Sequence, residues 1–278
     1  ATNFTDSILI QTNSDGSAPS TGTLSSASNN IGIGVDVFNV LTEGTGNVSL
    51  GYQASDSLTT GGENVHIGYQ AGQAAVGGYQ NVFIGSGAGY TDSNGIRAVA
   101  IGYRACYSAA MNYSTAVGGY ANSSGGSNAT AFGYKAGQSN TGTMNVAIGR
   151  EALDASGSGG YNTAIGGRHA LGAVTSGQYN IGLGYSAGDN ISSGDNNVVI
   201  GGADVTSATA DSQLSISDGD GGTVWITGVD TGGGSVRVQY PTTTNSYAFQ
   251  VASNSNNANP FSSTVKTTTT NAVQTSGH

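Results

Sequence analysis

The segment Asn64–Gly72, NVHIGYQAG, decides how this chain folds, because close variants of it recur along the sequence. Asn47–Ser55 reads NVSLGYQAS and Asn81–Gly89 reads NVFIGSGAG, so neighbouring copies lie 17 residues apart. Self-similarity at a fixed period is typical of repeat architectures, in which each unit contacts mainly its neighbours. The sequence therefore predicts a stack of similar units.

The glycine that follows a branched apolar residue marks each repeat. The spacing between consecutive marker glycines is 15 to 18 residues, and the repeats run from about Asn30 to Asp204. The eleven marker glycines are Gly34, Gly51, Gly68, Gly85, Gly102, Gly118, Gly133, Gly149, Gly166, Gly184 and Gly201.

Apolar residues alternate within the motif, as in Val65, Ile67 and Tyr69. A period of two is typical of a short strand with one apolar face, so we expect these residues to pack and His66 and Gln70 to lie outside. Clusters such as TTGGEN and SSGDNN follow and supply turns. Each repeat is thus predicted to be one coil of an all-β solenoid of about eleven ~17-residue coils, roughly 50 Å long at ~4.8 Å per coil.

Recurring polar and small residues of the motif are assigned structural roles. Asparagines before the strand would hydrogen-bond along the stack, and the glycines would permit close approach of backbones. The tyrosines are expected to form the edge of the apolar face. The alternative is that they are exposed and stack on sugar rings. The residues are Asn47, Asn64, Asn81, Asn145, Gly51, Gly68, Gly85, Gly149, Tyr52, Tyr69, Tyr103 and Tyr134.

A single repeat has too little core to be stable alone. It buries about three or four modest side chains at ~1.5–3 kcal/mol each, against ~1–2 kcal/mol of backbone entropy for each of its residues. We therefore expect apolar faces of several chains to share one axis, as a parallel homotrimer.

Composition excludes several classes of function. Glycine accounts for 47 of 278 residues and charged residues for 8%, with a net charge of −9. Seven scattered Lys and Arg residues make nucleic acid an unexpected partner, and the lack of a run of ~18 apolar residues argues against membrane insertion. The three histidines have no spacing that suggests a metal site or a nucleophile and base, so we expect no enzyme activity and no cofactor.

The periodicity divides the chain into four parts. They are a lead-in (1–29), the repeat shaft (30–204), a β-hairpin region (205–250) and a Ser/Thr/Asn-rich tail (251–278). In the hairpin, Leu214 and Ile216 are expected to face Val224 and Ile226, and the intervening Asp218 and Asp220 to form a turn instead of a calcium loop. Outside the repeats, the candidates for receptor contact are Trp225, Tyr240 and Tyr247.

Several repeats resemble those of tail-fibre proteins from marine bacteriophages, especially phages of cyanobacteria. The similar stretches include NVAIGREAL at 145, NIGLGYSAGD at 180 and NVVIGGADV at 197, and the resemblance extends to NFTDSILI at 3 and DSQLSISDGDGGTVWITG at 211. The short pattern is also similar to the heads of trimeric autotransporter adhesins of bacteria. No coiled-coil stalk or membrane anchor accompanies it, which favours the phage fibre.

Both resemblances imply a trimeric β-fibre that attaches to a cell surface. The phage resemblance implies a place in the virion tail and a host surface glycan or protein as partner. An adhesin head on a bacterial surface is the alternative, and a secreted filament in which strands exchange between subunits is a third.

Overall fold

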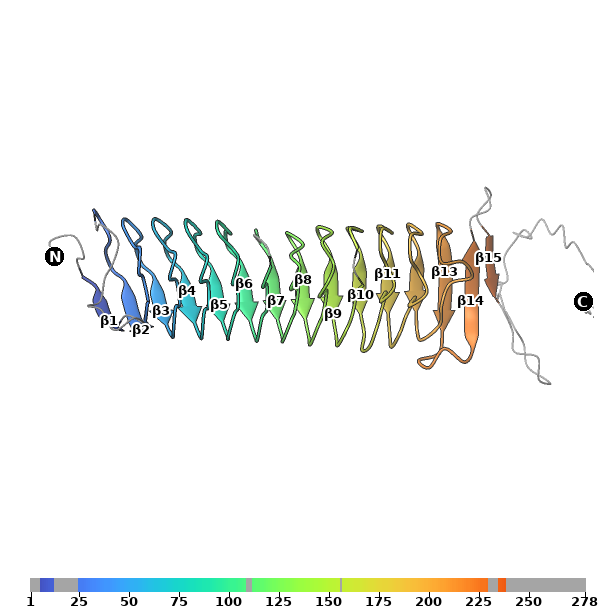
Figure 1. Cartoon of the computed structure of the whole chain (residues 1–278). Helices are drawn as coiled ribbons and strands as arrows, with labels where there is room; N and C mark the ends of the chain where they lie inside the picture. Colours follow the sequence, from blue (N-terminus) through green and yellow to red (C-terminus); the bar gives the residue numbers. More distant parts are fainter. Residues whose placement is uncertain (1–5, 13–24, 109–111, 156, 230–234, 239–278) are drawn as a thin grey trace, which may run out of the picture. The chain divides into compact units, whose positions relative to one another are not determined.

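The computed structural model describes residues 6–12, 25–108, 112–155, 157–229 and 235–238, and every regular element in these ranges is a β-strand (Figure 1). The strands form one sheet in chain order. They are β1 (Ile8–Thr12), β2 (Ile31–Val35), β3 (Val48–Leu50), β4 (Val65–Ile67), β5 (Val82–Ile84), β6 (Val99–Ile101), β7 (Thr115–Val117), β8 (Thr130–Phe132), β9 (Val146–Ile148), β10 (Thr163–Ile165), β11 (Ile181–Leu183), β12 (Val198–Ile200), β13 (Gln213–Ser217), β14 (Val224–Val229) and β15 (Ser235–Val238).

Consecutive strands from β1 to β13 pair in parallel, so equivalent residues of successive coils lie beside one another. Val65, for example, pairs with Val48 on one side and with Val82 on the other. The remainder of each coil is mostly turn, as the Gly- and Asn-rich clusters predict. The predicted all-β solenoid of about eleven ~17-residue coils is therefore confirmed.

The parallel sheet extends past both predicted ends of the shaft. Strand β1 lies within 1–29 and pairs with β2, and β13 lies within 205–250 and pairs with β12. Beyond β13 the direction reverses, because β13, β14 and β15 pair antiparallel. Of the four residues expected to face one another, Ile216 pairs with Ile226, whereas Leu214 lies opposite Gly228 and Val224 lies opposite Ser217. The expected register is therefore only partly right, and the register shifts between Ile216 and Ser217.

The interior of each coil takes the middle residue of the strand and not its two neighbours. In β4, His66 is fully buried while Val65 and Ile67 are partly exposed. The prediction that His66 lies outside is wrong. The coil is narrow, so one inward residue per strand meets the opposite turn, and the aliphatic pair points away from the coil.

Two positions of each coil share this narrow interior: the middle of the strand and the residue six positions later. In three coils one of the two carries a ring and the other is glycine: Gly32 with Phe38, His66 with Gly72, and Phe83 with Gly89. A Cβ at Gly32 would lie 2.8 Å from the Phe38 ring, and a Cβ at Gly89 would overlap the ring of Phe83. These coils therefore fill their interior through a volume balance between two residues of their own sequence, whereas Gly182 and Gly188 leave space that Leu171 of the preceding coil fills.

The marker glycines allow the coils to approach closely. Gly68 and Gly85 have φ of +135° and +130°, and a Cβ on Gly68 would lie 2.6 Å from the carbonyl oxygen of Gly85. Gly51 and Gly149 have the same backbone conformation, with φ of +135° and +127°. A side chain at this position would therefore be strained and would push neighbouring coils apart.

The asparagines before the strands form a hydrogen-bonded ladder inside the stack. The Nδ2 of Asn64 donates to Oδ1 of Asn47 (3.0 Å) and to the carbonyl oxygen of Gly78 (2.8 Å). Its Oδ1 accepts a bond from the backbone N–H of Asn81 (3.0 Å), and Asn145 makes corresponding bonds to Gly159 and Asn162. These side chains connect adjacent coils and satisfy buried backbone groups.

Candidate functional site

The most extensive candidate surface is the outward side of the parallel sheet, here called the strand face. It consists of the first and third residues of β3 to β12 and their equivalents in β2 and β13. One column is Ile31, Val48, Val65, Val82, Val99, Thr115, Thr130, Val146, Thr163, Ile181, Val198 and Leu214. The other is Ile33, Leu50, Ile67, Ile84, Ile101, Val117, Phe132, Ile148, Ile165, Leu183, Ile200 and Ile216.

The strand face is mainly apolar, with three threonines, and its side chains are partly or fully exposed in the single chain. Ile101 is 37% exposed and Phe132 is 44% exposed, although both belong to the regular sheet. Twelve layers at ~4.8 Å give a strip about 58 Å long, and two columns make it ~10 Å wide, or roughly 600 Å². That area is at the upper end of the ~300–600 Å² of the largest apolar patches on soluble monomers.

A column of tyrosines borders the strand face on the side where each strand ends. Tyr69 is 54% exposed, and its ring stacks on that of Tyr52 with centroids 5.2 Å apart. Further along, Tyr103 and Tyr134 are also exposed and contact the Tyr120 ring edge to face, at 5.2 and 6.3 Å. These tyrosines share the outward side with the aliphatic columns, as the alternation predicts, and do not enter the coil.

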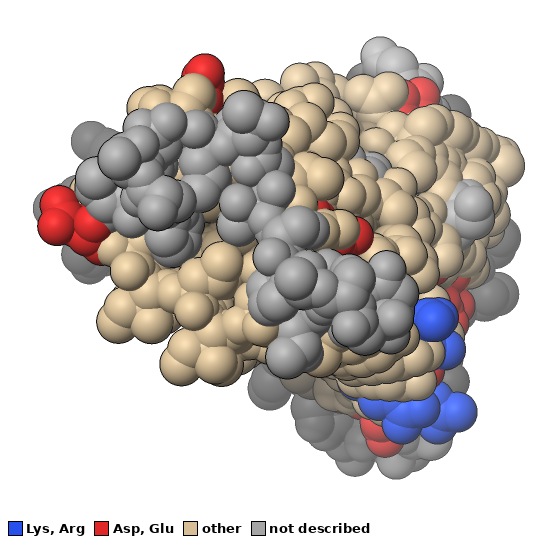
Figure 2. Space-filling view, turned by 60° about the vertical axis from the view of Figure 1, so that its left-hand side comes forward, with Lys and Arg blue, Asp and Glu red and all other residues tan. Residues whose placement is uncertain are grey.

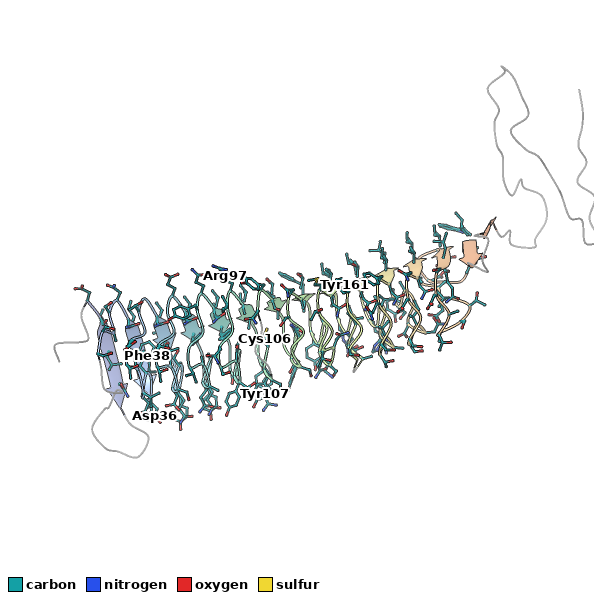
Figure 3. The ribbon with its side chains drawn as sticks, turned by 90° about the horizontal axis from the view of Figure 1, so that it is seen from above. Asp36, Phe38, Arg97, Cys106, Tyr107 and Tyr161 are labelled. Carbon is teal, nitrogen blue, oxygen red and sulfur yellow. The ribbon has the colours of Figure 1, made fainter. Side chains whose placement is uncertain are left out.

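A second aromatic column borders the opposite edge, before each strand. Tyr161 and Tyr179 stack at 4.8 Å, and the Arg97 guanidinium lies 5.8 Å from the centre of the Tyr113 ring. Figure 3 shows Arg97 and Tyr161 along one edge of the stack and Tyr107 along the other. The repeat motif did not predict this column. Its signal was the recurrent tyrosine one or two residues before the ladder position, as in GYQN and GQYN.

The three predicted receptor residues are not brought together by the described structure. Trp225 lies in β14 and is 51% exposed. Tyr240 and Tyr247 lie outside the described residues. A shallow pocket beside β14 is lined by Gln213, Ser215 and Thr227 among others.

Buried His66 is unsuited to catalysis at a surface. Its Nδ1 lies 2.6 Å from the Ser55 hydroxyl oxygen, and its ring stacks on Phe83 at 4.8 Å. Burial lowers the pKa of His66 to about 3, because the charged imidazolium would lose its hydration inside the coil. His66 is therefore a neutral packing residue at ordinary pH.

His169 lies between two carboxylates on the surface. Its Nδ1 is 3.2 Å from Asp154 Oδ1 and its Nε2 is 3.7 Å from Glu151 Oε2. The carboxylates contact opposite ring nitrogens, so the three groups do not converge on one point. No group of three or more His, Cys, Asp or Glu residues suited to a metal ion occurs in the part of the chain that the structure describes.

The acidic turn between β13 and β14 uses its carboxylates internally. Asp218 Oδ1 accepts a hydrogen bond from the backbone N–H of Thr223, and Asp220 Oδ1 accepts one from Gly222, both at 3.1 Å. The backbone hydrogen bond from Thr223 lowers the pKa of the Asp218 carboxyl. These bonds stabilise the turn.

Comparisons with protein-family models, with curated proteins and with solved structures found no match to this chain. Within the described ranges, the fold includes no helix with the length and apolar character needed to cross a membrane. The strand face and its two aromatic borders are therefore the features from which a function has to be argued.

Proposed function

We propose that this chain is a shaft segment of an extracellular attachment fibre, in which the strand faces of parallel copies pack together as a homotrimer. The observation that supports the proposal is that two mainly aliphatic columns, partly or fully exposed in the single chain, continue over twelve consecutive layers. An ordinary soluble monomer turns such a face toward its own core. Here the core of each coil lies on the other side of the sheet.

The strand face is large enough to drive association. At ~25 cal/mol per Å², burying roughly 600 Å² on each chain stabilises an assembly by ~15 kcal/mol per chain. The loss of translational and rotational freedom on association costs about 4–15 kcal/mol. The area buried on each chain also approaches the ~800 Å² that one partner contributes to an interface of standard size.

Threefold symmetry suits a face of two columns. Around a threefold axis each chain has two neighbours, so one column packs against one neighbour and the second column against the other. Such an arrangement closes and leaves neither column exposed. It also keeps the chains parallel, with the tyrosine columns outside the contact.

The attachment role rests on the resemblance of the repeats to phage tail fibres, and the virion tail is the location that follows. A rigid shaft of stacked coils fits this role, because it holds a contact surface at a distance from its anchor. A bacterial adhesin head would have the same shaft, and the genomic neighbourhood of the coding sequence distinguishes the two.

Replacement of Ile67, Ile84 and Ile101 by Asp tests the assembly. Sedimentation velocity should show the variant as a single chain, with a β-sheet circular dichroism spectrum like that of the wild type. The control Thr60→Asp adds a charge at an exposed turn outside the strand face and should sediment like the wild type. An unchanged sedimentation coefficient of the triple variant would contradict the proposal.

A further inference from the structure

The regular pattern of the stack breaks in its middle. Spacings between marker glycines fall from 17 to 16, 15 and 16 residues between Gly102 and Gly149. The asparagine ladder is interrupted in the same region, where Ala98, Ser114 and Ala129 occupy the ladder position. Ala98 and Ala129 have no side-chain group for the ladder, whereas the Ser114 hydroxyl keeps part of it by donating to the Gly126 carbonyl oxygen and accepting from the Ala129 N–H.

The irregular coils present a cluster of aromatic and basic side chains on their outer surface. The Arg104 guanidinium carbon lies 5.3 Å from the centre of the Tyr103 ring and 4.9 Å from that of Tyr107. The Lys135 ammonium lies 5.5 Å from the Tyr134 ring. We call this cluster the aromatic patch: Tyr103, Arg104, Tyr107, Tyr120, Tyr134 and Lys135.

The rings of the aromatic patch hold one another in place. Tyr120 contacts both Tyr103 and Tyr134, and its side-chain hydrogen bond to Tyr103 raises the pKa of the Tyr120 hydroxyl. Tyr107 stacks on Tyr90 of the preceding coil at 4.9 Å. A surface of mutually packed rings is pre-organised, so a ligand that stacks on it loses little side-chain entropy on binding.

The charge of this region is opposite to that of the chain. Residues 64–150 contain four basic residues (Arg97, Arg104, Lys135 and Arg150) and one acidic residue, Asp92, which gives +3. The remaining residues contain three basic and fifteen acidic residues, which gives −12. Asp92 is only 1% exposed, so no described acidic side chain is exposed over this stretch. In Figure 2, Lys and Arg atoms lie at one edge of the viewed face, with Asp and Glu atoms beside them.

We propose that the aromatic patch binds an acidic polysaccharide, with sugar rings on the tyrosines and carboxylates on Arg104 and Lys135. Tyrosine combines an apolar ring with a polar hydroxyl, which suits the C–H faces and hydroxyls of sugars. Arginine and lysine bind carboxylates through charge-assisted hydrogen bonds. Successive coils repeat at ~4.8 Å, comparable with the length of one sugar ring, so a linear glycan can follow the stack.

The patch is less suited to single-stranded nucleic acid. Proteins that bind single strands combine stacking aromatics with a positively charged groove along the backbone. In the aromatic patch, Arg104 and Lys135 lie directly beside the tyrosine rings and not along a separate track for a backbone. In a uronic acid the carboxylate is attached to the sugar ring itself, whereas the phosphate of a nucleotide is separated from the base by the ribose, so cations beside the stacking rings suit the uronic acid better.

This inference rests on the proposed attachment role and names the chemistry of the partner. The test is isothermal titration calorimetry of the full chain with polygalacturonate, with neutral dextran and with oligo(dT). We expect binding of polygalacturonate that weakens with salt, and weaker binding of the other two. Absence of polygalacturonate binding, or equal or tighter binding of dextran or oligo(dT), would overturn the proposal.

Matched variants locate the site. Tyr103→Ser/Tyr134→Ser should weaken polygalacturonate binding by about tenfold or more, equivalent to ~1.4 kcal/mol. Serine occurs naturally at this position as Ser86, which makes the change compatible with the coil. Tyr52→Ser/Tyr69→Ser removes two tyrosines of the same column outside the patch and should leave the affinity unchanged. Equal losses in both variants would refute the location.

Sedimentation of the same samples separates this inference from the proposed function. If Tyr103→Ser/Tyr134→Ser sediments like the wild type but no longer binds polygalacturonate, the loss of binding arises at the aromatic patch and not from altered assembly. If the wild type is a trimer that does not bind polygalacturonate, the proposed ligand is wrong and the proposed assembly still holds. If the wild type is a single chain that binds polygalacturonate, the proposed assembly is wrong and the aromatic patch is still the proposed binding site.

Discussion

The volume balance inside the coils predicts that Phe83 and Gly89 are energetically coupled. Phe83 is fully buried, so Phe83→Ala leaves a cavity and should cost about 3–5 kcal/mol of unfolding free energy. Gly89 has φ of +61°, and an added Cβ would overlap the Phe83 ring. Gly89→Ala should therefore cost about 1–3 kcal/mol for overpacking and ~1 kcal/mol for backbone strain.

In the double variant, the new methyl group occupies part of the cavity. The overpacking cost then disappears, and the total should be about 2 kcal/mol smaller than the sum of the single costs. Gly137→Ala is the matched control, because Gly137 has φ of +60° but its Cβ would have Ala147 Cβ as nearest atom, at 3.8 Å. It should cost only ~1 kcal/mol of strain and should add independently to Phe83→Ala.

Urea unfolding at one fixed chain concentration, followed by circular dichroism, measures all five variants. A fixed concentration is required because association contributes to stability. If the costs of Phe83→Ala and Gly89→Ala add without coupling, or if Gly137→Ala couples to Phe83→Ala equally strongly, the two-position account of the interior is refuted.

Two further predictions concern buried polar groups. Asn64→Ala removes side-chain hydrogen bonds to Asn47, Gly78 and Asn81 and should lower the unfolding free energy measured in urea by about 2–4 kcal/mol. The control Asn94→Ala, at an exposed turn, should change it by no more than ~0.5 kcal/mol. Similar costs for the two variants would contradict the ladder. Burial lowers the pKa of His66 to about 3 in the folded chain. As the pH falls below ~6.5, the imidazole of His66 is therefore protonated in the unfolded chain before it is protonated in the folded chain. The unfolding free energy should fall by up to ~1.4 kcal/mol per pH unit from pH 6.5 toward pH 3. His66→Phe should flatten this dependence by close to one proton, and an unchanged slope would show that His66 titrates freely in the fold.

The repeat made the fold predictable, because the spacing of the marker glycines and the apolar alternation in β4 can both be read directly from the sequence. Which side of the strand faces the coil interior was not predictable by the same rule. Alternation identifies two faces and does not say which is inside. The usual assumption that aliphatic residues point inward failed at His66, because the interior is too narrow for the aliphatic pair, and the pair lies on the outward side of the sheet.

The aromatic patch was only partly visible in the sequence. Tyr103 and Tyr134 belong to the motif, but Tyr107 and Tyr120 occupy other positions of their coils, and Arg104 joins them only through the turn that follows each marker glycine. Stacking of coils brings these positions together. The run of 87 residues with a single acidic residue was the sequence signal that pointed to this region.

Sedimentation equilibrium of the wild-type protein tests most directly whether the strand face is buried between chains. The mass should be three times the 27.5 kDa of one chain over a wide range of concentrations, because an interface of two aliphatic columns per chain closes at three copies. A mass of 27.5 kDa that persists at high concentration would contradict association, and a mass that grows without limit would contradict closure.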